Sequence, residues 1–437
     1  MQELKKMILE AGVVGAGGAG FPTHVKFAPN IQTVLINGAE CEPLAKTDLY
    51  LLKDYSKELE EILNSIVEKV GAKNGVIAIK KHTGEELGIE DGRKIGKVSY
   101  KHIPDIYPAG DEIILIKEAL GLDVPGGNLP ISVGVVVLNV ETLYNIKNAT
   151  CGKGVYEKFL TVGGETGKTY VLKVPVGTPV RHIFDSLNIK IPKNHDVIDG
   201  GPMMGNIINP DTAVVTKTTK ALLIIDENTL CIKIKKRNLS RAINQATSNC
   251  CSCRMCTDLC PRYLMGYPIE PHKIISSVVN NVADTKTFMG AFYCSNCGVC
   301  RTVACPQNLL PSLVFSKVKN ELSKHGVRAN VMEKTVPSTL REYRKIPVSR
   351  VVLRLGIKKY DRRAFEVVDI PISKQITLPL KMNIGAPAVS VVKAGDRVKA
   401  GQLIAKAPEN ALGTNLHASI SGVVKASNES CIIINAD

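Results

Sequence analysis

Two short runs of cysteine constrain the fold of this chain more than any other feature of its sequence. The first run contains Cys250, Cys253, Cys256 and Cys260, with Pro261 directly after it. The second run contains Cys294, Cys297, Cys300 and Cys305, with Pro306 directly after it. Three thiolates at this spacing can wrap around one [4Fe-4S] cube, whereas a fourth cysteine followed by proline reaches a second cube. The fold must therefore bring the two runs together.

The division of the cysteines between two clusters follows from the spacing C-x2-C-x2-C-x3-C-P, which is the pattern of bacterial ferredoxins. One cluster is expected to take Cys250, Cys253, Cys256 and Cys305. The other cluster is expected to take Cys294, Cys297, Cys300 and Cys260. We therefore predict an α-rich, ferredoxin-like domain with two [4Fe-4S] clusters over residues 240–318.

Zinc is the alternative ligand for such cysteines. Structural zinc sites use two separated C-x2-C pairs, and a third cysteine at the same spacing in each run has no function there. One departure from the ferredoxin pattern is that four residues, not three, separate Cys300 from Cys305, so this loop is expected to bulge. Cys251 is a spare thiol, expected to be a buried bystander or a substitute for its neighbour Cys250.

Length and composition describe a globular protein without a membrane span. A chain of 437 residues is expected to form about two to four domains. The longest apolar run, residues 133–140, is far shorter than the roughly 18 residues that a membrane helix needs. The start, MQELKKMILE, lacks the apolar core of a signal peptide, so we expect a cytoplasmic protein. The net charge of +15 is spread along the chain, which does not favour nucleic-acid binding.

The rest of the chain is expected to form four further segments. Residues 1–150 alternate helical patterns with strand-like apolar runs, which predicts an α/β domain. Residues 151–215 contain short β-rich pieces around one helix and are expected to form a small separate module. A basic connector covers residues 319–374. Residues 375–437 contain two short β units with turn glycines, which predicts an all-β sandwich with a structural or docking role.

A glycine-rich loop lies near the start, where residues 15–20 satisfy the dinucleotide fingerprint G-x-G-x-x-G. The fingerprint requires a strand before the glycines and a helix after them. Here a helical period covers residues 4–11, and Phe21 and Pro22 follow the loop, so a Rossmann site is not expected. The glycines still let backbone amides approach a flat ring or a phosphate closely.

Four segments together resemble the FMN- and NADH-binding subunit of respiratory complex I and its relative, the RnfC subunit of the Rnf complex. They are the glycine loop, NGAECEP at 37–43, YPAGDE at 107–112 and NVETL at 139–143. GGPMMG, at 200–205, is similar to the end of the ligand-binding β-grasp (SLBB-like) module of the same proteins. The resemblance therefore implies a FMN-binding α/β domain followed by a β-grasp module.

Carried over by position, the resemblance implies which residues bind FMN. The expected cofactor-binding residues are Gly15, Gly17, Gly18, Gly20, Phe21, Lys26, Asn37, Glu40, Gly110, Asp111, Glu112, Asn139 and Thr142. Glu42 matches the catalytic residue beside the nicotinamide ring of NADH. Ala39 stands where the family has an acid, and Phe21 and Phe27 are the aromatic residues near the loop that could stack on adenine.

The order of the parts narrows the resemblance further. In RnfC the sandwich lies at the amino terminus, but here GAPAVSVVKAGDRVKAGQLIA begins at Gly385, after the cysteines. This order resembles the corrin reductases of propanediol-utilising bacterial microcompartments, and their C-terminal domain implies a barrel-sandwich hybrid fold. The resemblance implies electron transfer from NADH, through FMN and two [4Fe-4S] clusters, to a corrinoid or a corrinoid-handling protein. Microcompartment shell or enzyme proteins are further expected partners. An RnfC-like subunit for another protein acceptor, or a non-enzymatic ligand-binding scaffold, is the alternative.

The cofactor content tests these expectations directly. Protein purified without oxygen should carry close to one FMN and about eight iron and eight labile sulfide per chain, because two cubes need that number. The FMN content is measured from the flavin absorbance, and the iron and sulfide contents by metal and labile-sulfide analysis of the purified protein. Zinc without acid-labile sulfide would contradict the iron-sulfur prediction.

Overall fold

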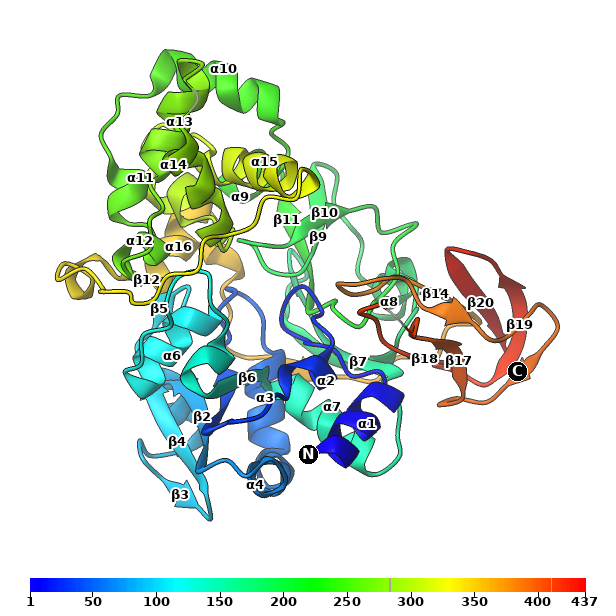
Figure 1. The fold of residues 1–437 in the computed structure, drawn as a ribbon. Coiled ribbons are helices and arrows are strands. Elements are labelled where there is room, and N and C mark those ends of the chain that lie inside the picture. The colour runs from blue at the N-terminus through cyan, green and yellow to red at the C-terminus, as the bar shows by residue number, and fades with distance from the viewer. Residues whose placement is uncertain (283, 410) are drawn as a thin grey trace.

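The structure is a computed structural model that describes residues 1–282, 284–409 and 411–437. Figure 1 shows four regions: an N-terminal α/β domain in blue and cyan, a second sheet beside it, a group of helices in green and yellow, and a β region at the red C-terminal end. The chain belongs to the mixed α/β class. The group of helices and the second sheet both lie against the N-terminal domain (Figure 1).

The N-terminal domain is built on a five-stranded sheet with the order β3-β4-β2-β1-β6. All neighbours are parallel except β3 and β4. Continuous Val, Ile and Leu runs form the central strands because both faces of a parallel sheet are covered by helices. The strands are β1 (Thr33–Gly38), β2 (Asn74–Lys80), β3 (Lys94–Ile95), β4 (Val98–Ile103) and β6 (Val135–Asn139).

Helices surround this sheet and alternate with its strands along the chain, as the sequence pattern predicted. They are α1 (Gln2–Glu10), α2 (Thr23–Lys26), α3 (Thr47–Asp54), α4 (Ser56–Val70), α5 (Lys81–Leu87), α6 (Glu112–Leu120) and α7 (Val140–Thr150). A helix, α1, precedes the glycine loop, and only a single bridge between Val14 and Pro22 closes the loop. The loop therefore lacks the strand that a Rossmann fingerprint requires.

The second sheet has six strands with the order β10-β9-β11-β7-β8-β13, and α8 (Val180–Ser186) packs on it. Its strands are β7 (Glu157–Gly164), β8 (Tyr170–Pro175), β9 (His195–Asp199), β10 (Asn206–Ile208), β11 (Ala221–Asp226) and β13 (Glu366–Val367). The sheet extends beyond the module expected at 151–215, because β11 lies between β9 and β7 and β13 comes from the connector. The apolar run ALLIID of β11 stands inside a lysine-rich passage, which hid it in the sequence.

A buried ion pair joins the first two regions. Lys158 on β7 donates to Glu141 on α7, and both side chains are 1% exposed. The Phe159 amide donates to the other oxygen of Glu141 at 3.1 Å. Because an unpaired buried charge is strongly destabilising, this contact fixes the second sheet against the N-terminal domain.

The cysteine region is helical. Its helices are α9 (Leu230–Lys235), α10 (Leu239–Asn249), α11 (Met255–Asp258), α12 (Pro261–Leu264), α13 (Pro271–Val279), α14 (Thr285–Met289) and α15 (Pro311–Lys324). The connector then forms β12 (Ile346–Pro347), which pairs with β5 (Ile106–Tyr107), and α16 (Val348–Leu355). The connector thereby ties the helical region to the N-terminal domain.

The C-terminal region consists of two small sheets packed around one apolar core. One sheet contains β14 (Gln375–Pro379), β20 (Cys431–Ala436), β19 (Gly422–Ser427) and β16 (Arg397–Val398). The other contains β15 (Val389–Ser390), β17 (Leu403–Lys406) and β18 (Leu416–His417). The Ile384 amide of this region donates to the carbonyl of Ala19 at 3.2 Å, so the sandwich contacts the glycine loop.

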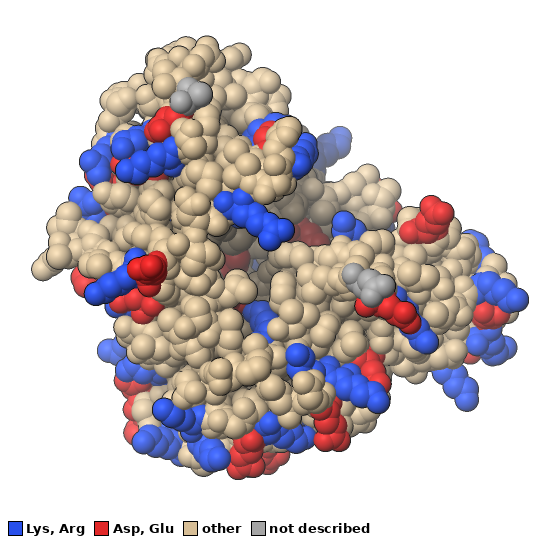
Figure 2. Space-filling view, in the orientation of Figure 1, with Lys and Arg blue, Asp and Glu red and all other residues tan. Residues whose placement is uncertain are grey.

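Within the described ranges, no helix has the length and apolar character needed to cross a membrane. Figure 2 shows Lys and Arg interspersed with Asp and Glu over the face in view, without a continuous basic stripe. That face therefore does not carry the concentrated positive charge that is typical of a nucleic-acid interface.

Candidate functional site

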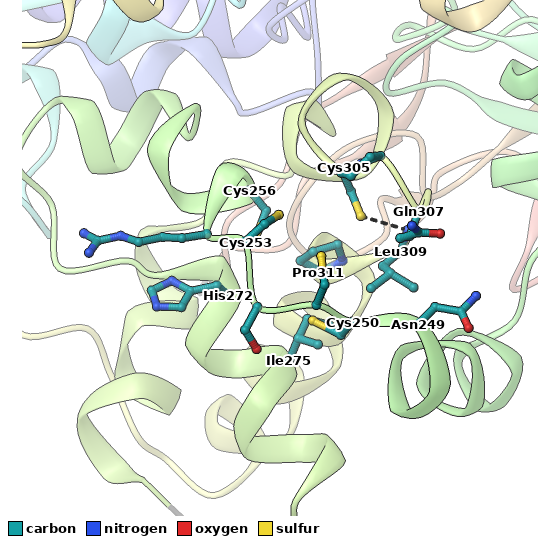
Figure 3. A pocket seen from close by; sticks show the side chains of 14 residues that line it. Asn249, Cys250, Cys253, Cys256, His272, Ile275, Cys305, Gln307, Leu309 and Pro311 are labelled. Carbon is teal, nitrogen blue, oxygen red and sulfur yellow. Dashed lines mark hydrogen bonds between the residues drawn. The ribbon is translucent and has the colours of Figure 1, made fainter.

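The fold brings the cysteines of both runs to two neighbouring pockets. The first, which we call the outer pocket, is lined by Cys250, Cys253, Cys256 and Cys305. Figure 3 shows these side chains around it, with Cys305 on a loop separate from the one that carries Cys250. Cys250 and Cys253 are exposed. All the residues that line this pocket fall between positions 249 and 311 and therefore belong to the cysteine region, not to the N-terminal domain.

The second pocket, which we call the inner pocket, is lined by Cys260, Cys294, Cys297 and Cys300. Cys260 and Cys300 are buried. This pocket contacts the N-terminal domain, because the Tyr107 hydroxyl donates to the Cys297 carbonyl at 2.7 Å. The pockets differ in environment: one faces solvent, and the other lies against the flavin motifs.

The extra residue in the second run is absorbed locally. Cys300–Ala304 forms a π-helical turn, which holds one residue more per turn than an α-helix. Cys305 directly follows this turn and lies in the outer pocket, although the other cysteines of its run line the inner one. The loop therefore bulges, as the sequence predicted, without preventing the crossing of Cys305.

The donor sets of both pockets fit a cubane cluster. Burial raises the pKa of the Cys256 and Cys297 thiols to about 12, and it raises the pKa of Cys260 and Cys300 as well. Ligand thiols must lose their protons to bind iron, and the positive charge of the iron in a cluster favours that ionisation in a buried pocket. In the described ranges no three His, Cys, Asp or Glu side chains converge on a point that could hold one ion. A cube accepts wider spacing because each thiolate binds a different iron.

Hydrogen bonds to sulfur are present in each pocket. The Asn296 amide donates to Cys294 Sγ and the Leu309 amide donates to Cys305 Sγ, both at 3.4 Å (Figure 3 shows the latter). Such bonds help to set the potential of a bound cluster. Cys251 also lines the outer pocket, but it is exposed, so the expectation that it is a buried bystander is wrong. The exposed loop around Cys250 leaves its neighbour in solvent.

The predicted flavin residues gather at the carboxyl ends of two adjacent parallel strands. Asn37 on β1 and Asn139 at the end of β6 are register partners. Asn37 donates to the Gly110 carbonyl at 2.9 Å, and Asn139 caps α7 by accepting from the Glu141 amide at 3.1 Å. Since ligands bind at this edge of parallel α/β sheets, the sheet itself positions these motifs for a cofactor.

The glycine loop packs on the start of α7 while part of its backbone stays open. The Ala16 amide donates to Thr142 Oγ1 at 3.0 Å, and a Cβ at Gly17 would lie 2.9 Å from Asn139 Nδ2. Gly17 and Gly18 are exposed, and within the described ranges their amides donate to no backbone carbonyl. Open amides of this kind suit a phosphate or a flat ring, so the loop fits FMN.

Lys26 and Glu112 form an ion pair at 2.6 Å beside this loop. Lys26 also donates to the Val137 carbonyl of β6 at 3.0 Å. Asp111 caps α6 by accepting from the Ile113 amide at 3.0 Å. These contacts hold two of the predicted flavin-binding motifs against each other, and they leave the flavin-binding roles of Lys26, Asp111 and Glu112 as predictions.

Glu40 and Glu42 point to different partners. Glu40 accepts from the Asp48 amide at 2.7 Å and pairs with Lys220 at 3.0 Å. Glu42 accepts from the amides of Met203 and Met204, at 2.9 and 2.7 Å, within the GGPMMG segment. A Cβ at Gly201 would lie 2.1 Å from the Glu42 carboxylate, so this segment needs its glycine. Burial raises the pKa of Glu42.

Some placements differ from a family-based expectation or were not foreseen. Phe27 is fully buried in the main core, so it cannot stack on an adenine; Phe21 is partly exposed. Arg262, two residues after Cys260, forms an ion pair with Asp111, and its place just after a Cys-Pro pair was the only available sequence signal. Lys220 pairs with Glu40 and Asp48 across the domain boundary, which a sequence cannot reveal.

Comparison with known families agrees with this arrangement. Residues 8–148 match the family described as Nuo51 FMN-binding domain. Residues 249–310 match the 4Fe-4S dicluster domain, and residues 353–436 match the RnfC barrel sandwich hybrid domain. The chain therefore carries domains for FMN and for two 4Fe-4S clusters, and the resemblance on which these cofactors were predicted is confirmed.

Known proteins similar to this chain include cobalamin reductases and subunits of ion-translocating oxidoreductase complexes. The cobalamin reductase PduS of Salmonella typhimurium is 36% identical over 99% of this chain and 96% of its own length. Its counterpart in Citrobacter freundii is 35% identical with the same coverage. The second group is represented by a protein of the Na(+)-translocating ferredoxin:NAD(+) oxidoreductase complex of Acetobacterium woodii. That protein is 31% identical over 62% of this chain and 60% of its own length.

The position of Cys305 leads to a prediction about cluster ligands. Cys305→Ser should impair the cluster held by Cys250, Cys253 and Cys256, because Cys305 lines their pocket. Electron paramagnetic resonance (EPR) of the reduced protein, with iron analysis, should show one perturbed cluster and one unchanged cluster.

The matched control is Cys251→Ser, which changes a thiol in the same pocket that is not expected to bind iron. It should leave both signals unchanged. Selective loss of the cluster held by Cys294, Cys297 and Cys300 in Cys305→Ser would contradict the crossing.

Proposed function

Because the chain belongs to the family of the cobalamin reductase PduS, we propose that it is an NADH-dependent oxidoreductase that reduces a corrinoid. The observation that carries the proposal is the meeting, in one chain, of the flavin motifs and two four-cysteine pockets. The overall reaction balances as NADH and two cob(III)alamin giving NAD+, one proton and two cob(II)alamin.

The residues of the N-terminal domain hold the flavin in this proposal. Gly17 and Gly18 supply open backbone amides, and Lys26 stands near the phosphate. Gly15 and Gly20 shape the same loop, since the Gly15 amide already donates to the Phe21 carbonyl at 2.9 Å and Gly20 is buried. The side chains of Asn37, Asp111, Glu112, Asn139 and Thr142 orient the remaining groups. When bound by these residues, FMN would supply the conversion of a two-electron donation from NADH into single electrons, which one-electron acceptors such as iron-sulfur clusters and cobalt require.

The cysteine side chains hold the clusters as the ferredoxin pattern assigns them. Cys250, Cys253, Cys256 and Cys305 bind one cluster in the outer pocket. Cys260, Cys294, Cys297 and Cys300 bind the other in the inner pocket. The burial of the inner pocket and the exposure of the outer one give the two clusters different surroundings, and surroundings determine cluster potential.

The finer assignments belong to the same proposal. We assign residues 1–150 to the FMN and NADH domain, 151–215 with β11 to an SLBB-like β-grasp module, 240–318 to the clusters, 319–374 to the connector and 375–437 to the sandwich. The resemblance to microcompartment corrin reductases supports a location inside such a compartment, with shell or enzyme proteins as partners. The contact between Ile384 and the glycine loop supports a structural role for the sandwich near the flavin.

Glu42 tests the NADH half of the proposal. Glu42→Gln should slow reduction of the flavin by NADH severalfold or more while FMN stays bound, because its proposed role is towards the nicotinamide. Stopped-flow absorbance of the flavin measures this rate. Glutamine loses one of the two amide contacts to Met203 and Met204, so the thermal unfolding midpoint must be measured as well. An unchanged rate of reduction with a lowered midpoint would make Glu42 structural.

Corrinoid reduction tests the whole proposal. The purified protein, given NADH and FMN without oxygen, should reduce cob(III)alamin to cob(II)alamin, followed by absorbance. Cys253→Ala should slow this step more than it slows flavin reduction, because the clusters stand between FMN and cobalt. If the flavin is reduced but corrinoid reduction is no faster than with free reduced FMN, a dedicated protein acceptor becomes the better answer.

A further inference from the structure

We propose that the ion pair of Arg262 and Asp111 is a positioning element that sets the reduction potential of a cluster in the inner pocket. The pair joins the cysteine region to the flavin domain through two opposite charges. The inference rests on the proposed cluster sites, but not on NADH or a corrinoid as donor or acceptor.

The geometry of the pair is specific. Arg262 Nη2 lies 2.8 and 2.9 Å from the two carboxylate oxygens of Asp111, and Nε lies 3.1 Å from Oδ2. Only 7% of the Asp111 side chain and 17% of the Arg262 side chain are exposed. The guanidinium also lies 5.5 Å from the centre of the Tyr267 ring. The planar guanidinium of Arg262 is held by several contacts at once, so its charge has a fixed position, unlike that of a mobile cation on the surface.

The pair lies directly against the inner pocket. Arg262 lines that pocket together with Cys260, Cys294 and Cys297, and it is the second residue of α12, which begins at Pro261. Asp111 also acts electrostatically on the Cys297 thiol. Arg301 and Lys319 are two more cations that act electrostatically on Cys294, but among the described residues neither forms a hydrogen bond or ion pair with the flavin domain.

Asp111 gives the pair its connection to the flavin site. It caps α6 and follows Gly110, whose carbonyl accepts from Asn37. The hydroxyl of Tyr107, in the same segment, donates to the Cys297 carbonyl. One short loop therefore contacts both the predicted flavin motif and the loop that carries an inner-pocket cysteine.

The sign of the effect follows from charge. A [4Fe-4S] cluster held by four thiolates gains negative charge on reduction, and in a poorly solvated pocket a neighbouring charge acts strongly on that step. The intact pair is neutral. Removing Arg262 leaves the Asp111 carboxylate, which opposes reduction, whereas removing the Asp111 charge leaves the guanidinium, which favours it. If the contact were purely structural, the two substitutions would not be expected to shift the midpoint potential in opposite directions.

The experiment is an EPR-monitored redox titration of the full chain with chemical mediators and dithionite. Arg262→Gln should shift the midpoint potential of the inner cluster to a more negative value. Asp111→Asn should shift it to a more positive value, and asparagine can still cap α6. Arg262→Lys, which keeps the charge, should lie closer to the parent than Arg262→Gln. A separate Cys253→Ser protein, which perturbs the outer cluster, identifies which signal is the inner one.

The matched control is Arg254→Gln, the same substitution at a side chain that is 48% exposed beside the outer pocket. Solvent screens its charge, so the inner midpoint should stay unchanged. Shifts of the same sign in Arg262→Gln and Asp111→Asn, or no shift in either with both clusters retained, would overturn the inference. If Arg262→Gln does not fold, Asp111→Asn decides alone: a positive shift supports the inference, and no shift overturns it. Iron and sulfide analysis separates this result from a failure of the proposed cluster sites.

Discussion

The other regions are held in position by contacts with the loops at the carboxyl edge of the parallel sheet in residues 1–150. The loops that leave this edge carry Asn37 to Glu42, Tyr107 to Glu112 and Asn139 to Thr142. Between them they contact two other regions. Glu42 accepts amides of the GGPMMG segment and Glu141 pairs with Lys158 on β7, both in the region of the second sheet, whereas Tyr107 and Asp111 reach the cysteine region. Parallel strands end at one edge, so one sheet can present flavin groups and docking groups together.

Buried charges at these contacts make the arrangement of regions specific. Lys158 with Glu141, Lys220 with Asp48 and Arg262 with Asp111 each join two regions, and every member is largely buried. An ion pair of this kind adds little stability compared with apolar packing, but a misplaced region would leave a charge buried without its partner. Lys217 is different: it donates to the carbonyls of Gly12 and Asn415, and burial lowers its pKa to about 7. Lys217 thereby connects its own segment to the segment that precedes the glycine loop and to the C-terminal sandwich through backbone carbonyls. Burying a neutral amine in this way costs less desolvation free energy than burying a charged one.

The parts of this molecule that sequence could predict are those determined by local spacing. The helix before the glycine loop, a strand within the apolar run 133–140, the bulge after Cys300 and the α-rich character of residues 240–318 each depend on a short stretch of chain. The partners of single polar residues could not be predicted, because they come from distant segments. The amides that bind Glu42 lie about 160 positions further along the chain, and the partner of Asp111 lies 151 further. The β11 strand was missed because its apolar run lies among lysines.

The two pockets differ in their exposure and in their neighbours, and this difference favours one direction of electron transfer through the molecule. Negative charge added in the outer pocket can be stabilised by water, because Cys250 and Cys253 are exposed there. In the inner pocket burial opposes the same charge, and the cations Arg262, Arg301 and Lys319 have to offset it. The inner pocket contacts the flavin domain through Tyr107 and Asp111, whereas the residues described around the outer pocket all belong to the cysteine region, and that pocket opens at the surface. We therefore expect electrons to pass from the flavin domain to the inner pocket first and to leave the protein at the outer pocket, where an acceptor as large as a corrinoid can approach without entering the fold.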